Sequence, residues 1–373
     1  MWGFVLFLTF VHALVPIPKP SGTYDVGHNS MELVDTSRYD PYASDHRKRA
    51  VVVSAFYPVL DSRCRNACLV EYMPPATAAF YGQQFALYGV PNDTLQQLRL
   101  QVCCDSPKLR HEDIIQYPVV LFSPGLGSSR LTYSIIAQSV SSSGYIVITI
   151  DHPYDAEIVE FPDGSYVLGA NITSLDAIVA AVAVRAQDAS FVLRQLGSTS
   201  VVSQLIPGST CGLNTRRAAM FGHSLGGATT TSVMLNDSRF VGGINMDGSV
   251  FGPVVDAGLN KPYLLFNHEG YTQANDTTWA ALWPRLRGWK RELGIEGTQH
   301  NSFTDLPILA DVLGLRGELA PEIVGIIGTI NGFRMLEVLT TYVSTFFDFV
   351  LKRSKAPLLD RPSRSFPEVV IVA

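Results

Sequence analysis

Apolar positions along this chain gather in short blocks that are separated by longer amphipathic stretches. From residue 117 onward, continuous apolar runs at 119–122, 145–150 and 218–221 alternate with helix-like stretches such as 130–143 and 174–196. Strands that are buried on both faces have continuous apolar sequences, and helices between them form the crossovers of a parallel sheet. The pattern therefore predicts an α/β fold with a mostly parallel central sheet and helices on both faces.

The C-terminal half continues the same alternation. Further strands are predicted at 241–246, 263–267 and 294–298, and the amphipathic stretch from Asn331 to Lys352 predicts a long helix that closes the domain. Ahead of the regular part, residues 49–59 are rich in Val and aromatic side chains and predict an early strand.

One large domain fits the length and composition of the chain. It has 373 residues, of which 47% are hydrophobic and 16% charged, enough to bury a single core. The apolar leader 1–13 ends in a small residue and predicts a secretory signal peptide rather than a retained anchor, because the run is shorter than the roughly 20 residues that span a membrane. We place the domain at 14–355 and expect the proline-containing tail, 356–373, to be exposed.

A segment around 61–116 departs from the pattern and is interpreted as an insertion. It contains an amphipathic stretch at 80–102, and it either packs on the core or covers the substrate entrance. Four of the five cysteines lie here, which predicts one or two local disulfides in an oxidising compartment. One thiol must then stay free or pair between molecules. Secretion would also expose four glycosylation sequons. The four sequons begin at Asn92, Asn171, Asn236 and Asn275.

Charge argues against nucleic acid as a partner. The net charge is −5, and the one basic run, residues 46–49, is interpreted as the solvated start of the strand that follows it. The cysteines form no zinc pattern with paired histidines. Neither a metal nor an organic cofactor is expected.

The sequence Gly222-His223-Ser224-Leu225-Gly226 carries the strongest chemical signal. It lies between a predicted strand and a predicted helix, and glycines flank the serine where the chain must turn sharply. Such a turn exposes the serine hydroxyl at a helix N-terminus, close to backbone N–H donors. Ser224 is therefore predicted to be the nucleophile of an α/β-hydrolase fold.

A serine nucleophile needs a histidine base, which comes late in the chain in this fold. His300 follows the last predicted strand, where the fold places the base, whereas His268 is interpreted as a structural or pocket-edge histidine. The acid that orients the base is Asp247 or Glu269, which follow successive predicted strands. From the residues alone, these two carboxylates rank evenly.

Several motifs, in order along residues 118–313, resemble the platelet-activating factor acetylhydrolase family. They are Phe122–Gly127, Gly144–Val147, Asp151-His152, Gly222–Thr229, Met246–Gly248 and His300–Asp305. The resemblance implies a triad of Ser224, Asp247 and His300, and so favours Asp247 over Glu269. It also implies that the backbone N–H groups of Leu126 and Leu225 bind the oxyanion. The chain departs from the animal members of the family at Pro124, where they have His.

The resemblance further implies a secreted, calcium-independent, phospholipase A2-like enzyme that cleaves short acyl esters and works near a lipid surface. Lipases, polyester hydrolases, small-molecule esterases and acyltransferases share the fold, so fold alone leaves the substrate open. Retention of all three triad candidates argues against a catalytically silent binding protein. Asp151-His152 precedes the nucleophile and is interpreted as a pair that shapes the pocket. Asp305 either braces the histidine loop or begins a helix.

Overall fold

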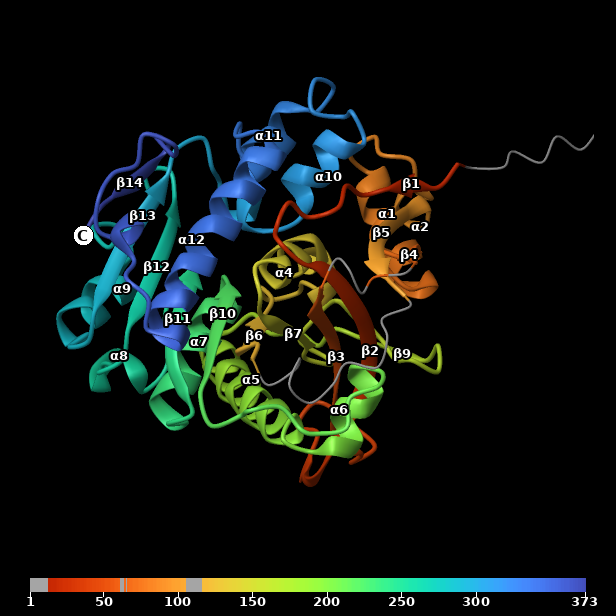
Figure 1. The fold of residues 1–373 in the computed structure, drawn as a ribbon, viewed down its shortest axis with the longest axis horizontal. Coiled ribbons are helices and arrows are strands. Elements are labelled where there is room, and N and C mark those ends of the chain that lie inside the picture. Colours follow the sequence, from red (N-terminus) through yellow and green to blue (C-terminus); the bar gives the residue numbers. More distant parts are fainter. Residues whose placement is uncertain (1–12, 61–63, 65, 105–115) are drawn as a thin grey trace, which may run out of the picture.

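A nine-stranded sheet forms the centre of the molecule, with β14 at one edge and β2 at the other (Figure 1). The computed structural model describes residues 13–60, 64, 66–104 and 116–373. The predicted signal peptide, 1–13, therefore lies outside the described residues except for Ala13. In sheet order the strands are β14 (Val369–Ile371), β13 (Lys290–Ile295), β12 (Tyr263–His268), β11 (Phe240–Met246), β10 (Ala218–His223), β6 (Val119–Ser123), β7 (Ile146–Asp151), β3 (Lys48–Val59) and β2 (Asp25–Tyr39).

The inner strands of this sheet run parallel. All neighbours from β13 through β12, β11, β10 and β6 to β7 pair in parallel, whereas β3, β2 and β14 are antiparallel additions at the two ends. The predicted mostly parallel sheet of an α/β-hydrolase fold is confirmed. Its parallel strands all end at the same edge of the sheet, which is where the loops that carry chemistry meet.

Helices cover both faces of the sheet, and β6 shows how its side chains divide between them. Val120 and Phe122 join the core under α4 and α12, while Val119 and Leu121 join the core under α5, α6 and α7. Successive strand residues point to opposite faces, so an apolar run serves both cores. These helices are α4 (Ser134–Ser142), α5 (Leu175–Gln195), α6 (Thr199–Leu205), α7 (Leu225–Asn236) and α12 (Gly332–Lys352), and α10 (Leu306–Val312) precedes α12 in the chain.

One segment in the described part of the chain, Pro321–Lys352, is both long and apolar, and it includes α11 (Pro321–Ile327) and α12. By length and composition alone it is sufficient to cross a membrane. Its second part is a core helix here, because α12 buries Val343, Phe346 and Phe347 completely against the sheet.

The predicted insertion folds into a small second sheet with two helices. Strand β5 (Leu98–Cys103) lies in the middle of this sheet and pairs with β4 (Ala67–Glu71) on one side and with β1 (Val15–Pro16) on the other. Helices α1 (Pro75–Ala86) and α2 (Thr94–Gln97) lie between β4 and β5 in sequence. The amphipathic stretch at 80–102 thus divides among three elements. Disulfides join Cys64 to Cys103 and Cys68 to Cys104, and Cys211 is free, as the cysteine count predicted.

Three sequence expectations were wrong. The last parallel strand begins at Lys290 rather than 294, because the buried Glu292 is hydrogen-bonded by Asn267 and so fits inside the sheet. The tail 356–373 is not simply exposed, since β14 pairs with β13 and Val369 is buried. Arg49 belongs to the basic run taken as solvated, yet it is 1% exposed and paired with Asp40 and Asp188.

Candidate active site

Ser224 occupies the sharp turn between β10 and α7. Its φ is +54° and ψ is −121°, a conformation that is strained for any residue with a Cβ atom, and its N–H donates to Met246 O at 2.8 Å. The turn leaves the Ser224 side chain facing a cavity of about 390 Å³ whose lining includes Asp247, His268 and His300.

Crowding around this turn explains the flanking glycines. A Cβ atom on Gly226 would lie 1.9 Å from Ser123 O, and one on Gly222 would lie 2.3 Å from Gly226 O. A side chain on Gly226 would push α7 away from β6, and one on Gly222 would push β10 away from α7. The glycines therefore let the nucleophile turn pack directly against the end of β6.

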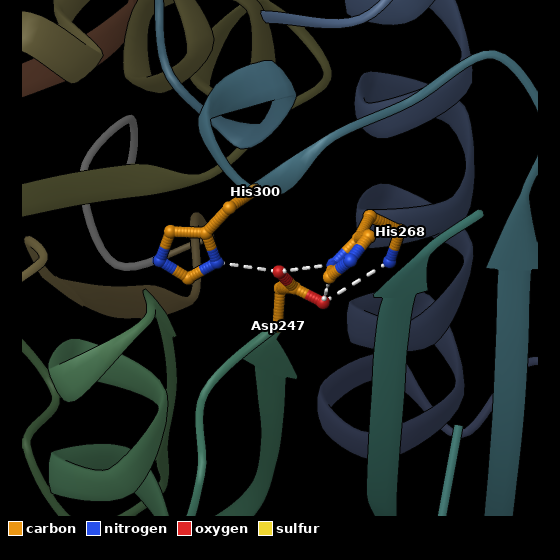
Figure 2. Close-up of side chains that lie close together, drawn as sticks. All are labelled: Asp247, His268 and His300. Atoms are coloured by element: carbon orange, nitrogen blue, oxygen red, sulfur yellow. Dashed lines mark hydrogen bonds and ion pairs between the residues drawn. The ribbon is translucent and has the colours of Figure 1, made fainter. Parts of the chain in front are cut away.

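Asp247 follows β11 and accepts hydrogen bonds from two histidines (Figure 2). His300 Nδ1 donates to Asp247 Oδ2 at 2.5 Å, and His268 Nδ1 lies 2.7 and 2.8 Å from the two carboxylate oxygens. Burial by itself raises the pKa of Asp247, but the hydrogen bonds from His268 and His300 outweigh it and lower the pKa to about 2. The carboxylate is thus ionised at neutral pH.

The other candidate acid, Glu269, points elsewhere. Its carboxylate accepts the backbone N–H of Gly297 at 2.8 Å, and its own N–H donates to Thr298 Oγ1. It makes no hydrogen bond to His300 in the structure. Of the two carboxylates that the sequence ranked evenly, the structure brings Asp247 to His300.

Two backbone N–H groups beside Ser224 are free to donate. The neighbouring Gly125 N–H donates to Tyr133 Oη and the Gly127 N–H to Asp155 O, whereas within the described residues nothing accepts from the N–H of Leu126 or Leu225. Leu225 begins α7, so its N–H also lies at the positive end of that helix. Both residues line the same cavity as Ser224.

Arg185 of α5 holds the loop that presents Leu126. Its guanidinium donates to Pro124 O at 2.6 Å and to Gly125 O at 3.1 Å, and it pairs with Asp155. The side chain is 1% exposed. Arg185 was not predicted from the sequence, although an arginine four positions after the buried Ala181, on the apolar stripe of a helix, is a usable signal.

His223 and Tyr133 join the same loop to the base. Gly125 N–H donates to Tyr133 Oη, which lies 2.8 Å from His223 Nδ1, and His223 Nε2 lies 2.9 Å from His300 O. Because a carbonyl oxygen can only accept, His223 carries its proton on Nε2 and accepts the Tyr133 hydroxyl proton on Nδ1. Burial, followed by the nearby His300, lowers the pKa of His223 to about 3.

Asp305 anchors the segment that follows His300. Its carboxylate accepts the N–H groups of Ile135 and Ile136 at the start of α4 and the hydroxyl of Tyr72 from the insertion. Burial raises its pKa to about 7 despite these donors. The segment that carries His300 is therefore tied both to the core and to the insertion.

Asp151 and His152 lie beneath the loop and outside the cavity lining. His152 Nε2 lies 3.0 Å from Ser123 Oγ, its Nδ1 lies 2.9 Å from Asp188 Oδ2, and Asp151 pairs with Arg130. His152 thus contacts Ser123, which precedes the loop of Leu126, and the role of the pair in shaping the pocket stays a prediction.

Asp247, His268 and His300 are also the one group of described residues whose donor atoms are close enough to suggest a metal site, all within 4.8 Å of one another. The N···O separations of 2.5 and 2.7 Å are those of hydrogen bonds. Two ligands of a tetrahedral zinc ion lie about 3.3 Å apart. The spacing fits a carboxylate shared by two imidazoles better than a preformed zinc site.

The fold and the site together have counterparts among known proteins. Residues 10–161 and 209–342 match the family described as platelet-activating factor acetylhydrolase, isoform II. The chain belongs to this family. The motif resemblance found in the sequence is thereby confirmed.

Individual members and relatives extend this finding. The chain is 37% identical over 95% of its length, and 93% of the relative's, to a probable 1-alkyl-2-acetylglycerophosphocholine esterase of Arthroderma benhamiae. It is 25% identical over 86% of its length, and 76% of the relative's, to the platelet-activating factor acetylhydrolase of Cavia porcellus. A ferulic acid esterase from Streptomyces cinnamoneus superposes with a TM-score of 0.81 at 34% identity, over 97% of this chain and all of that one. The chain is a carboxylic ester hydrolase similar to platelet-activating factor acetylhydrolases.

Proposed function

We propose that this chain hydrolyses the short acyl ester of a phospholipid of the 1-alkyl-2-acetylglycerophosphocholine type through an acyl-enzyme on Ser224. The observation that carries the proposal is the hydrogen bond of His300 Nδ1 to Asp247, in the cavity that Ser224 faces. A histidine held through Nδ1 offers Nε2 as a base. The names of the Arthroderma and Cavia relatives supply the substrate class.

In the first half-reaction, Ser224 Oγ attacks the ester carbonyl while His300 Nε2 takes the hydroxyl proton. Asp247 stabilises the imidazolium that forms. The N–H groups of Leu126 and Leu225 donate to the oxyanion, and such donors are each worth about 3 to 4 kcal/mol. As the intermediate collapses, His300 returns the proton to the departing alcohol. Water then attacks the acyl-enzyme by the same route and frees the carboxylic acid.

The cavities support a substrate with one short and one long chain. The cavity at Ser224 is partly polar, and we assign it to the ester group and its short acyl chain. A second cavity of about 250 Å³ is almost wholly apolar and is lined by Leu95, Leu309 and Ile323, among others, and by Asn301, the residue after His300. We assign it to the hydrocarbon chain of a lipid, which would be drawn from a lipid surface. Calcium plays no part in this chemistry.

We further propose that the protein is secreted. Two disulfides within the insertion are typical of an oxidising compartment. The asparagines of all four sequons are exposed, as glycosylation requires. Mass spectrometry of the protein from culture medium would show cleavage of the leader and glycans at these positions; detection only inside cells would contradict secretion.

A fluorophosphonate probe tests the nucleophile directly. We expect one adduct, on Ser224, and we expect Ser224→Ala to lower hydrolysis of p-nitrophenyl acetate by at least about 10⁴-fold. Hydrolysis should persist in EDTA. Rates on p-nitrophenyl esters from acetate to palmitate, and then on short-acyl phospholipids, should fall as the acyl chain lengthens. An unlabelled Ser224 in folded protein, or a preference for palmitate, would contradict the proposal.

A second candidate substrate is an ester of a hydroxycinnamic acid. The 34% identity to the ferulic acid esterase favours it, and the aromatic side chains of Phe251 and Tyr271 line the cavity at Ser224. Methyl ferulate and a 2-acetyl phospholipid, compared by kcat/KM, separate the two candidates.

A further inference from the structure

His268 makes more contacts with the triad carboxylate than the base itself does. Its Nδ1 lies 2.8 Å from Asp247 Oδ1 and 2.7 Å from Oδ2, and its backbone N–H donates to Oδ1 at 3.0 Å. His300 contributes a single hydrogen bond. Figure 2 shows the Asp247 carboxylate between the two imidazole rings.

The ring of His268 is itself fixed. It stacks on Tyr271 with ring centroids 4.9 Å apart and planes 7° apart, and the Tyr271 hydroxyl donates to Asp276 at the start of α9 (Thr277–Leu282). An imidazole held in this way has one orientation to offer to Asp247. Asp247 lies at a positive φ of 59° and is 3% exposed, so its carboxylate depends on such neighbours for its own orientation.

Hydrogen-bond chemistry sets the protonation of both rings. An ionised carboxylate can only accept, so each histidine carries its proton on Nδ1 and has its lone pair on Nε2. For His300 this is the arrangement that a general base needs. For His268 it means that a second imidazole bound to the Asp247 carboxylate has a nitrogen, Nε2, that can accept a proton.

We propose that His268 is a positioning residue of the triad. Neutral His268 orients Asp247 toward His300, and protonated His268 neutralises the negative charge of Asp247. The inference rests on the proposed function, since it assumes that His300 acts as the base. One carboxylate cannot fully stabilise two imidazolium ions. A proton on His268 therefore opposes the protonation of His300 on which attack by Ser224 depends.

In the part of the chain that the structure describes, no second carboxylate contacts the His268 ring and could stabilise its positive charge in place of Asp247. Asp247 is the carboxylate in contact with its ring, and Asp276 is reached only through Tyr271. The carboxylate of the adjacent Glu269 is turned to Gly297 N–H. His300 is the other titratable ring on Asp247. Protonation of an imidazole is favoured as the pH falls, so the effect belongs to the acid side of the pH profile.

Two substitutions of His268 separate its two roles. The amide nitrogen of asparagine occupies the position of Nδ1, so His268→Asn keeps a donor to Asp247 and removes the second proton acceptor. His268→Leu removes both. His46→Asn is the matched control, because His46 is exposed. Each full-length variant is assayed on p-nitrophenyl acetate from pH 5 to 9, and its thermal unfolding is recorded to show that it is folded.

At pH 8 we expect His268→Leu to lose about 10-fold in kcat with KM within about twofold, the loss of one charge-assisted hydrogen bond that orients the acid. His268→Asn should recover most of that loss and shift the acid limb of kcat by roughly 0.5 unit to lower pH, because one inactive protonation state is gone. His46→Asn should match the unsubstituted protein.

Two results would overturn the inference. Both His268 variants could match the unsubstituted protein in kcat and in pH profile, or both could lose activity equally with no shift of the acid limb, which indicates a merely structural role. Failure of the proposed function gives a different result, because Ser224→Ala would then keep the full rate whatever His268 does.

Discussion

At the residue scale, the carboxylates Asp247 and Glu269 end neighbouring strands but face different partners. Asp247→Asn keeps the shape and loses the charge that stabilises the His300 imidazolium, so we expect kcat to fall by about 10³ to 10⁴-fold. Glu269→Gln still accepts from Gly297 N–H, and its kcat/KM should stay within about threefold. Steady-state assays on p-nitrophenyl acetate give both values; the reverse order would assign the acid to Glu269.

Arg185 donates hydrogen bonds to the loop that presents the Leu126 N–H, and its removal should affect both stability and activity. Arg185→Met removes the donors to Pro124 and Gly125 and leaves Asp155 buried without its partner. Breaking a buried pair in this way costs about 3 to 5 kcal/mol of the free energy of unfolding. Because the Leu126 N–H is displaced with the loop, kcat should also fall by about 10²-fold in the molecules that remain folded.

The matched control for Arg185 lies on the same helix. Arg194 is exposed near the end of α5, and Arg194→Met should change the free energy of unfolding by less than about 0.5 kcal/mol. Urea denaturation measures both variants. Equal losses would contradict the prediction, because they would mean that the buried pair of Arg185 and Asp155 does not stabilise the fold.

Some site residues could be predicted from the sequence because local rules require them. Ser224 lies between glycines that the turn demands, and His300 follows a strand, so both have a signature in their neighbours. His268 has no such signature, and the place of Arg185 on an apolar helix stripe indicates burial but not its partner, since both act through contacts with Asp247 and Gly125, which are far away in sequence. The sequence showed a histidine and a helical arginine, and only the tertiary structure supplied their partners.

At the element scale, the same distinction separates the strands. The inner parallel strands are continuous apolar runs and were predicted. The part of β13 that was missed, Lys290 to Glu292, is polar, because Lys290 and Arg291 are partly exposed near the sheet edge and Glu292 has hydrogen-bond partners inside it. The strand β14 was missed because its three residues follow prolines and form a strand only by pairing with β13.

The alternation within β14 gives a direct test of its contribution. Val369 is 4% exposed and packs into the core, while the next residue, Val370, is 44% exposed on the opposite face. Val369→Asp buries an unpaired charge and should lower the free energy of unfolding by about 2 to 4 kcal/mol, whereas Val370→Asp should change it by less than about 0.5 kcal/mol. Urea denaturation compares them; equal effects would mean that the tail does not pack as a strand.

At the scale of the whole molecule, buried titratable groups with opposite effects set the response to acid. The pKa of His223 is lowered by burial to about 3, so between pH 6.5 and 3 the unfolded chain binds a proton there that the native protein does not. That group makes the protein less stable as pH falls. The pKa of Asp305 is raised by burial to about 7, so its effect has the opposite sign. The change in the free energy of unfolding at low pH therefore depends on the difference between such opposing contributions.

A comparison of the unsubstituted protein with the His223→Gln variant isolates the contribution of His223. Each pH unit between 6.5 and 3 costs about 1.4 kcal/mol for His223, so the unsubstituted protein should lose about 2 kcal/mol more than His223→Gln when the pH falls from 7.5 to 5. The contribution of Asp305 is common to both and cancels. The free energy of unfolding in urea, measured at the two pH values, gives the difference. Equal losses would show that His223 is protonated at pH 5 in the native protein as well. Its Nδ1 would then not accept the Tyr133 hydroxyl proton, which the hydrogen bonds from Gly125 through Tyr133 and His223 to His300 require.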